Sequence, residues 1–160
     1  MSRDPVYLSK AGRAKLEQNL LTLKTVERPR IVSEITRAMH LGDLSENAEY
    51  HAAKEAQQHL ERKIADLEDK LSRVRSIDID KIPTDKAYLF AEVQVQNLDN
   101  KKEKISYKLM PPEETDVDND EISVKSPIGV GLLGKSVGDR VEIQVPAGLL
   151  RYKILKISRE

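Results

Sequence analysis

The chain has 160 residues, and its 27 basic and 27 acidic side chains give a formal net charge of zero, which argues against a general nucleic-acid coat or a polybasic membrane binder. It contains no cysteine, which excludes disulfides and cysteine-based metal sites or nucleophiles. No apolar run approaches the roughly 20 residues of a membrane span, and the first residues lack a signal-like segment, so we expect a cytoplasmic protein that does not bind membranes.

The first predicted element is a long amphipathic helix that begins after Ser9, a residue type that commonly caps helix N-termini. With one exception, its apolar residues recur at steps of three and four: Leu16, Leu20, Leu23, Ile31, Ile35 and Ala38. The exception is the step of eight residues from Leu23 to Ile31, within which Pro29 lies. Because proline lacks an N–H and crowds the preceding turn, we expect a kink or break there.

A second amphipathic helix is predicted after residue 46. Its apolar residues follow a heptad pattern: Leu60, Ile64, Leu67, Leu71 and Val74. Folding the chain at residues 43–44 places Leu20 opposite Leu67 and Leu23 opposite Ile64, so the two apolar faces match as an antiparallel coiled-coil hairpin. A compact three- or four-helix bundle is the alternative, but it needs further amphipathic helices that the sequence does not supply.

The apolar period changes to two in the second half of the chain, after a linker over residues 77–85 that contains Pro83. Short strands are predicted near residues 91–96, 105–109, 121–125, 140–145 and 151–157, with a small helix near 128–135. The fold class is therefore α+β. Residues 1–78 form the predicted coiled-coil hairpin, and residues 79–160 form a small, mostly antiparallel sheet domain with one helix.

Two carboxylates, Asp43 and Glu46, fall at the predicted tip of the hairpin. Their spacing fits a capping box, in which Asp43 caps the second helix and Glu46 reaches back to the cap amide. The functional alternative is a site for a hard cation. Two carboxylates are too few to hold Mg²⁺, which takes a near-octahedral set of oxygen ligands, so a partner would have to complete such a site.

Two further patterns have structural explanations. The segment 129–134 is a literal G-x-G-x-x-G, but Ser126 and Pro127 interrupt the approach to it, and no acidic residue stands about 20 positions later. We therefore reject a dinucleotide site and expect these glycines to let a short helix pack closely and turn. His40 and His51 lack the spacing of metal ligands, so solvated histidines are expected at the tip.

The tip motif resembles that of the bacterial transcript-cleavage factors, the GreA/GreB family, and within it the GreA branch. Residues 42–50 read Gly-Asp-Leu-Ser-Glu-Asn-Ala-Glu-Tyr, and the likeness continues through His51-Ala52-Ala53-Lys54-Glu55. It returns at residues 122–128, Ile-Ser-Val-Lys-Ser-Pro-Ile, and at residues 131–135, Gly-Leu-Leu-Gly-Lys. The order of hairpin and sheet is also that of the family, so the resemblance spans nearly the whole chain.

The resemblance implies that the hairpin enters the secondary channel of bacterial RNA polymerase and that the second domain, similar in fold to FKBP-type proteins, docks at the channel rim. The factor then stimulates the polymerase's own cleavage of backtracked RNA. Asp43 and Glu46 match the family's acidic tip residues, which help to hold a weakly bound Mg²⁺ shared with the polymerase. Ser126 and Pro127 are the residues that we expect at the rim contact.

By the same resemblance, Asn47, Tyr50 and Lys54 are expected near the nascent RNA 3′ end. The family usually places a basic residue shortly before the Gly-Asp pair. In this sequence Met39-His40-Leu41 precede Gly42, and Arg37 is the nearest arginine and the RNA-proximal residue on this side, so we expect a thin basic patch and a preference for short backtracks. The resemblance also implies a monomer that is classed with DNA-binding proteins.

The sequence therefore predicts an accessory factor and not an enzyme, because no nucleophile or complete metal site is recognisable in it. The first alternative is a channel-binding inhibitor that does not stimulate cleavage. Such relatives alter the acidic tip, whereas this chain keeps both carboxylates. The second alternative, a peptidyl-prolyl isomerase, needs an aromatic-lined pocket, which is improbable with Phe90 as the single Phe and no Trp.

Overall fold

A computed structural model describes residues 4–159. The chain divides into two compact units, one up to Ser76 and one from Ile77 onward. No helix of the described residues is both long enough and apolar enough to cross a membrane.

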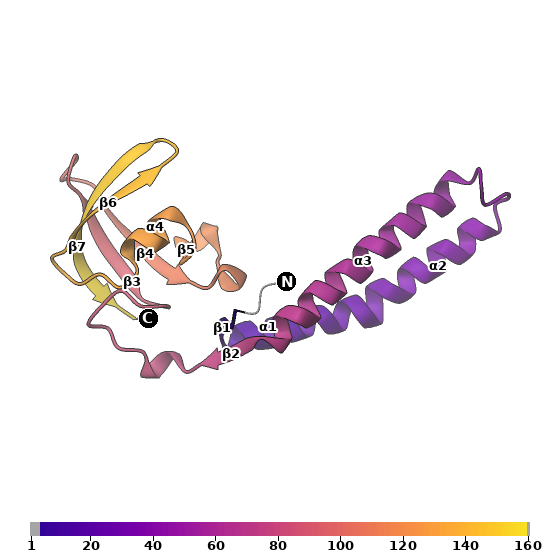
Figure 1. The fold of residues 1–160 in the computed structure, drawn as a ribbon, viewed down its shortest axis with the longest axis horizontal. Helices are drawn as coiled ribbons and strands as arrows, with labels where there is room; N and C mark the ends of the chain where they lie inside the picture. Colours follow the sequence, from indigo (N-terminus) through magenta and orange to yellow (C-terminus); the bar gives the residue numbers. More distant parts are fainter. Residues whose placement is uncertain (1–3, 160) are drawn as a thin grey trace. The chain divides into compact units, whose positions relative to one another are not determined.

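The first unit is a helical hairpin, as predicted (Figure 1). Its first arm comprises α1 (Lys10–Thr22), a π-helix η1 (Leu23–Glu27) and α2 (Arg28–Met39), and its second arm is α3 (Ala48–Ser72). Ser9 caps α1 as expected, because its hydroxyl oxygen accepts a hydrogen bond from the Gly12 amide at 3.0 Å. The capped start fixes where the first arm begins.

The predicted break at Pro29 is instead a π-helical segment directly before it, and the arm stays helical throughout. The amide of Arg28 donates to the carbonyl of Leu23, five residues earlier. A π-turn holds one extra residue compared with an α-turn. The step of eight from Leu23 to Ile31 therefore behaves as a regular step of seven, and both residues belong to one apolar seam.

The two arms pack through this seam, in which Ile31, Leu60 and Ile64 are buried. Partly buried apolar residues surround them: Leu20, Leu23, Ile35 and Ala56. Ion pairs between the arms run in antiparallel order, Lys24 with Glu68 at 3.4 Å and Arg28 with Glu61 at 2.8 Å. Val74, predicted as the last seam residue, lies beyond the end of α3, in a strand.

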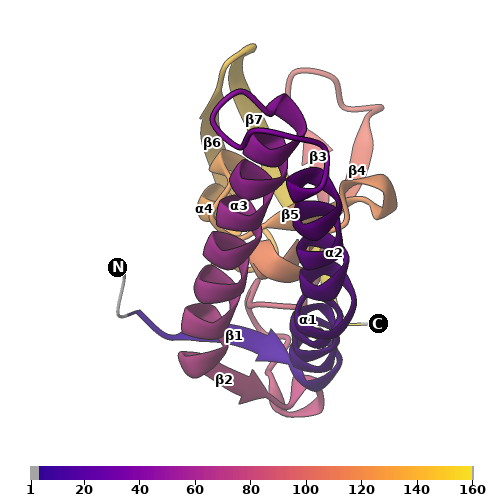
Figure 2. The same cartoon turned by 90° about the vertical axis from the view of Figure 1, so that its right-hand side faces the viewer.

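That strand closes the end of the hairpin away from the tip, a feature that the sequence analysis did not predict. β1 (Val6–Ser9) and β2 (Val74–Ile77) lie side by side as a two-stranded sheet (Figure 2). The Val6 amide donates to the Arg73 carbonyl at 3.0 Å, and the Leu8 side chain is fully buried. The two ends of the hairpin are thereby tied together.

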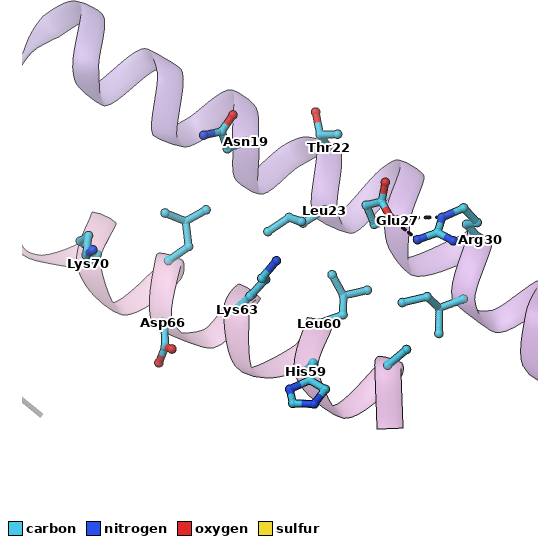
Figure 3. Close-up of a pocket in the computed structure, with 13 residues that line it drawn as sticks. Asn19, Thr22, Leu23, Glu27, Arg30, His59, Leu60, Lys63, Asp66 and Lys70 are labelled. Carbon is cyan, nitrogen blue, oxygen red and sulfur yellow. Dashed lines mark hydrogen bonds and ion pairs between the residues drawn. The ribbon is translucent and has the colours of Figure 1, made fainter. Parts of the chain in front are cut away.

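A groove of about 840 Å³ lies between the arms, beside η1 (Figure 3). Leu23 from the first arm and Leu60 from α3 point into the space between the ribbons. Charged side chains, including Arg30, Lys63 and Asp66, complete the lining. No residue of the 41–50 stretch lines this groove, so the predicted site lies elsewhere.

The second unit is built on a five-stranded sheet with the order β5-β4-β3-β7-β6. Its strands are β3 (Glu92–Asn97), β4 (Lys104–Met110), β5 (Glu121–Ser123), β6 (Arg140–Val145) and β7 (Gly148–Ser158). All neighbouring pairs are antiparallel except β4 and β5, which are parallel. The predicted α+β class with a mostly antiparallel sheet is confirmed.

The connecting segments contain short 3-10 helices, η2 (Ile79–Lys81), η3 (Pro112–Glu114) and η4 (Val117–Asn119). Helix α4 (Pro127–Leu132) packs on the sheet through the fully buried Leu132. A Cβ at Gly129 would lie 2.0 Å from the Ser123 carbonyl oxygen, and one at Gly131 would lie 2.6 Å from the Ile143 side chain. Gly129 and Gly131 therefore serve close packing of the helix, whereas Gly134, with open space around it and a φ of +80°, lies at the turn after the helix; both were expected.

Candidate functional site: the tip of the hairpin

The tip is the short connection between α2 and α3. The Leu41 amide donates to the Ala38 carbonyl at 3.0 Å, and the backbone of Gly42 has a φ of +141°. Residues other than glycine rarely adopt that backbone conformation. Nothing lies within 4 Å of where a Cβ would be, so backbone conformation and not space accounts for glycine at this position.

Asn47, and not Asp43, caps α3, so the predicted capping box is wrong. The Asn47 side-chain oxygen accepts from the Tyr50 amide at 3.0 Å. The same side chain donates from Nδ2 to the Ala38 carbonyl at the end of α2, at 2.5 Å. Asn and Asp are equally good caps, and this second bond, which a carboxylate cannot donate, favours Asn47.

The Asp43 side chain instead accepts hydrogen bonds within the tip loop. Its Oδ1 accepts two hydrogen bonds from Ser45, one from the amide at 3.0 Å and one from the hydroxyl at 2.9 Å. These bonds lower the pKa of the Asp43 carboxyl below its ordinary value, so the group stays anionic. The second oxygen, Oδ2, has no partner among the described residues and remains available to a ligand.

Glu46 differs from Asp43 because its carboxylate is exposed and has no hydrogen-bond or ion-pair partner in the described part of the chain. Its amide donates to the Asp43 carbonyl at 3.3 Å, which keeps the two residues in one turn. The tip thus offers one carboxylate that is held in place and one that is free to adapt.

These two carboxylates do not form a complete metal site. Within residues 4–159 no group of three or more His, Asp or Glu side chains is arranged to hold a metal ion. The donor set still suits a hard cation such as Mg²⁺, which prefers oxygen ligands and keeps some of its waters. Further ligands would have to come from a partner molecule.

The remaining predicted tip residues occupy the first turns of α3 and the last turn of α2. Tyr50 packs edge-on against His51, with ring centroids 5.6 Å apart. Lys54 donates from Nζ to Gln57 Oε1 at 3.1 Å, and Arg37 lines a shallow hollow together with Glu49. Their proximity to RNA stays a prediction.

His51 is a tip residue whose role the sequence analysis missed. Its Nε2 lies 3.3 Å from the carbonyl oxygen of Ser45, so the ring is bonded to the tip loop and not merely solvated. Such a bond over six residues leaves no periodic signal in a sequence. Leu41 is also exposed at the tip, with 60% of its surface accessible.

In the second unit, Ser126 and Pro127 have a local structural role. The Ser126 hydroxyl caps α4, accepting from the Gly129 amide at 3.1 Å and donating to the Ser123 carbonyl at 2.6 Å. Pro127 is the first residue of that helix and is exposed. Their predicted contact with polymerase stays a prediction. Phe90, named for the isomerase alternative, is buried, with 2% of its surface accessible.

Comparisons with known proteins cover both units. The family described as "Transcription elongation factor, N-terminal" matches residues 6–75, and "Transcription elongation factor, GreA/GreB, C-term" matches residues 82–159. The chain is 49% identical to transcription elongation factor GreA of Chlorobium phaeobacteroides, over 96% of this chain and 97% of that protein.

Two further matches extend the comparison. The GreA of Chloroherpeton thalassium is also 49% identical, over 97% of this chain and 98% of that protein. The crystal structure of GreA factor homolog 1 of Thermus thermophilus shares 27% identity over 96% of this chain and 99% of that chain, with a TM-score of 0.44. The two family matches together span most of the chain, which therefore belongs to the GreA/GreB family of transcription elongation factors.

Proposed function

We propose that this protein is an accessory factor of bacterial RNA polymerase that stimulates the polymerase's own cleavage of backtracked nascent RNA. The hairpin enters the secondary channel and brings Asp43 and Glu46 to the polymerase active site. The factor has no complete active site of its own and does not cleave RNA alone. The observation that supports this function best is a pair of exposed carboxylates at the tip of a helical hairpin.

The carboxylates complete a cation site whose other ligands the polymerase supplies. In metal-assisted phosphodiester hydrolysis, divalent ions activate the attacking water and steady the leaving oxygen. Asp43 presents its Oδ2, which has no partner among the residues that the structure describes, and the carboxylate stays ionised because Ser45 stabilises its charge. Among residues 4–159 the Glu46 carboxylate has no hydrogen-bond or ion-pair partner to give up, so it adapts to the ligands that the polymerase supplies.

RNA cleavage in a stalled, backtracked RNA polymerase complex with Mg²⁺ tests this function. The intact protein should shorten the extruded RNA when polymerase is present and leave free RNA unchanged when it is absent. Blocked RNA synthesis without cleavage would favour the channel-binding inhibitor instead. Cleavage of free RNA without polymerase would show that the protein is itself a nuclease.

A further inference from the structure

Two side chains from the start of the second arm make hydrogen bonds at the tip. Asn47 joins the two arms, because its nitrogen donates to the Ala38 carbonyl at the end of α2 while its oxygen caps α3 at the Tyr50 amide. Asn47 is partly buried, and both polar atoms of its amide are used. Asn47 thereby links the end of α2 to the start of α3, the two helix ends that the loop connects.

His51 acts on the middle of the same loop. Its Nε2 donates to the Ser45 carbonyl at 3.3 Å, and its ring is supported by the edge-on contact with Tyr50. Ser45 in turn donates its amide and its hydroxyl to Asp43. A continuous series of contacts thus leads from His51 through Ser45 to the Asp43 carboxylate.

We propose that Asn47 and His51 are positioning residues, which hold the tip loop so that Asp43 and Glu46 present their carboxylates in one arrangement before a partner is bound. The other hydrogen bonds that the structure shows in the loop, from Leu41 to Ala38, from Glu46 to Asp43 and from Ser45 to Asp43, each join residues no more than three positions apart, so they do not tie the loop to the second arm. Prior ordering reduces the free energy that binding must spend on immobilising the ligands. The consequence for cation binding rests on the proposed function, whereas the ordering of the loop does not.

Substitutions can separate this role from simple helix capping. Asn47→Asp keeps the capping oxygen but cannot donate to the Ala38 carbonyl, and its extra negative charge would favour cation binding if charge alone mattered. His51→Phe keeps the aromatic contact with Tyr50 but has no N–H. His51→Gln restores a donor. His59→Phe, an exposed histidine farther along α3, is the matched control.

The first measurement uses the free protein and needs no polymerase. Backbone ¹⁵N relaxation of residues 43–46 should give order parameters of about 0.85 in the parent, His51→Gln and His59→Phe proteins. In Asn47→Asp and His51→Phe they should fall toward about 0.6 or lower. Unchanged order parameters in both of these variants would overturn the proposal.

The second measurement uses backtracked complexes over a range of Mg²⁺ concentrations. Loss of one hydrogen bond of ordinary strength should raise the Mg²⁺ concentration for half-maximal cleavage by about two- to tenfold in Asn47→Asp and His51→Phe. His51→Gln should recover most of that loss, and competition for polymerase should be unchanged. A Mg²⁺ dependence equal to the parent's in both variants would also count against the proposal. If the parent itself does not stimulate cleavage, the proposed function fails, and the relaxation measurement alone decides the role of Asn47 and His51.

Discussion

Arg28 and Glu61 join the two arms of the hairpin through a pair of hydrogen bonds, from Nε to Oε1 at 2.8 Å and from Nη2 to Oε2 at 2.9 Å. Both side chains are exposed, so water and salt weaken their attraction. We expect a double-mutant cycle with Arg28→Ala and Glu61→Ala to give a small coupling in the free energy of unfolding that fades at high salt. A coupling that persists in about 1 M salt would contradict this estimate of a solvated pair.

The same pair predicts a pH dependence. The hydrogen bond from Arg28 lowers the pKa of the Glu61 carboxyl in the folded protein. The stabilisation is therefore fully present above the ordinary Glu pKa of about 4.3 and is lost as the pH falls through the lower folded value. Measured against pH, the coupling should disappear only in this acidic range, and a loss near neutral pH would exclude Glu61 as its source.

The π-helix predicts how the first arm responds to a one-residue deletion. Removing Val26, whose side chain is 55% exposed, shortens the step from Leu23 to Ile31 to seven, which fits a continuous α-helix. Pro29 would then lie in an uninterrupted α-helix without the π-turn before it, at a cost of about 3 kcal/mol. Thermal unfolding should show this loss for the deletion alone and its recovery when Pro29→Ala is added. If the combined variant were as unstable as the deletion alone, η1 would not be an accommodation of Pro29.

Substitutions of one buried and one exposed leucine test whether the apolar seam stabilises the hairpin. Leu60 is 6% exposed and lies in the seam, whereas Leu21 is 52% exposed. Leu60→Ala should lower the free energy of unfolding by about 2–5 kcal/mol, because it removes buried methyl groups and leaves a cavity. Leu21→Ala, the matched control, should change it by no more than about 0.5 kcal/mol. Equal losses in denaturant unfolding would mean that the seam is not the core of the arm.

The hydrogen bonds from Ser45 lower the pKa of the Asp43 carboxyl, which can be tested by substitution. Both Ser45 hydrogen bonds favour the charged carboxylate, and Ser45→Ala removes the one from the hydroxyl. The pKa of Asp43 should therefore rise toward its ordinary value, and the carboxylate should be protonated at a higher pH than in the parent. Carbon-detected NMR titration of the Asp43 carboxyl measures this directly. A pKa that does not move would show that the hydroxyl contributes nothing to the ionisation.

Much of the fold could be predicted because long periodic patterns report burial directly. The alternation of Val93 and Val95 with polar residues placed β3, and the apolar steps of the first half placed both arms. Strands β1 and β2 were missed because each has four residues, too few for a pattern. The parallel pairing of the three-residue β5 with β4 has no signal in its own residues either.

The tip shows the limit of such reasoning for the candidate site. Asp43 and Asn47 are both good helix caps, and local sequence cannot decide between them. Asn47 is favoured as the cap because its side chain also donates a hydrogen bond to the Ala38 carbonyl of the other arm. Ala38 lies nine residues before Asn47 in sequence. The π-helix arises in the same way, because the extra residue before Ile31 is absorbed only once the seam has to match α3.

We propose that Asp43 and Glu46 act together in a cation site completed by RNA polymerase. The most direct test is the rate of RNA cleavage in backtracked complexes with Asp43→Asn, Glu46→Gln and the double variant, and with Glu49→Gln as a control carboxylate in the first turn of α3. Each tip substitution should reduce the stimulated rate by on the order of a hundredfold, the double variant should lose little more, and Glu49→Gln should resemble the parent. A double variant that cleaves as fast as the parent while still binding polymerase would contradict the claim and leave the tip carboxylates with no part in the reaction.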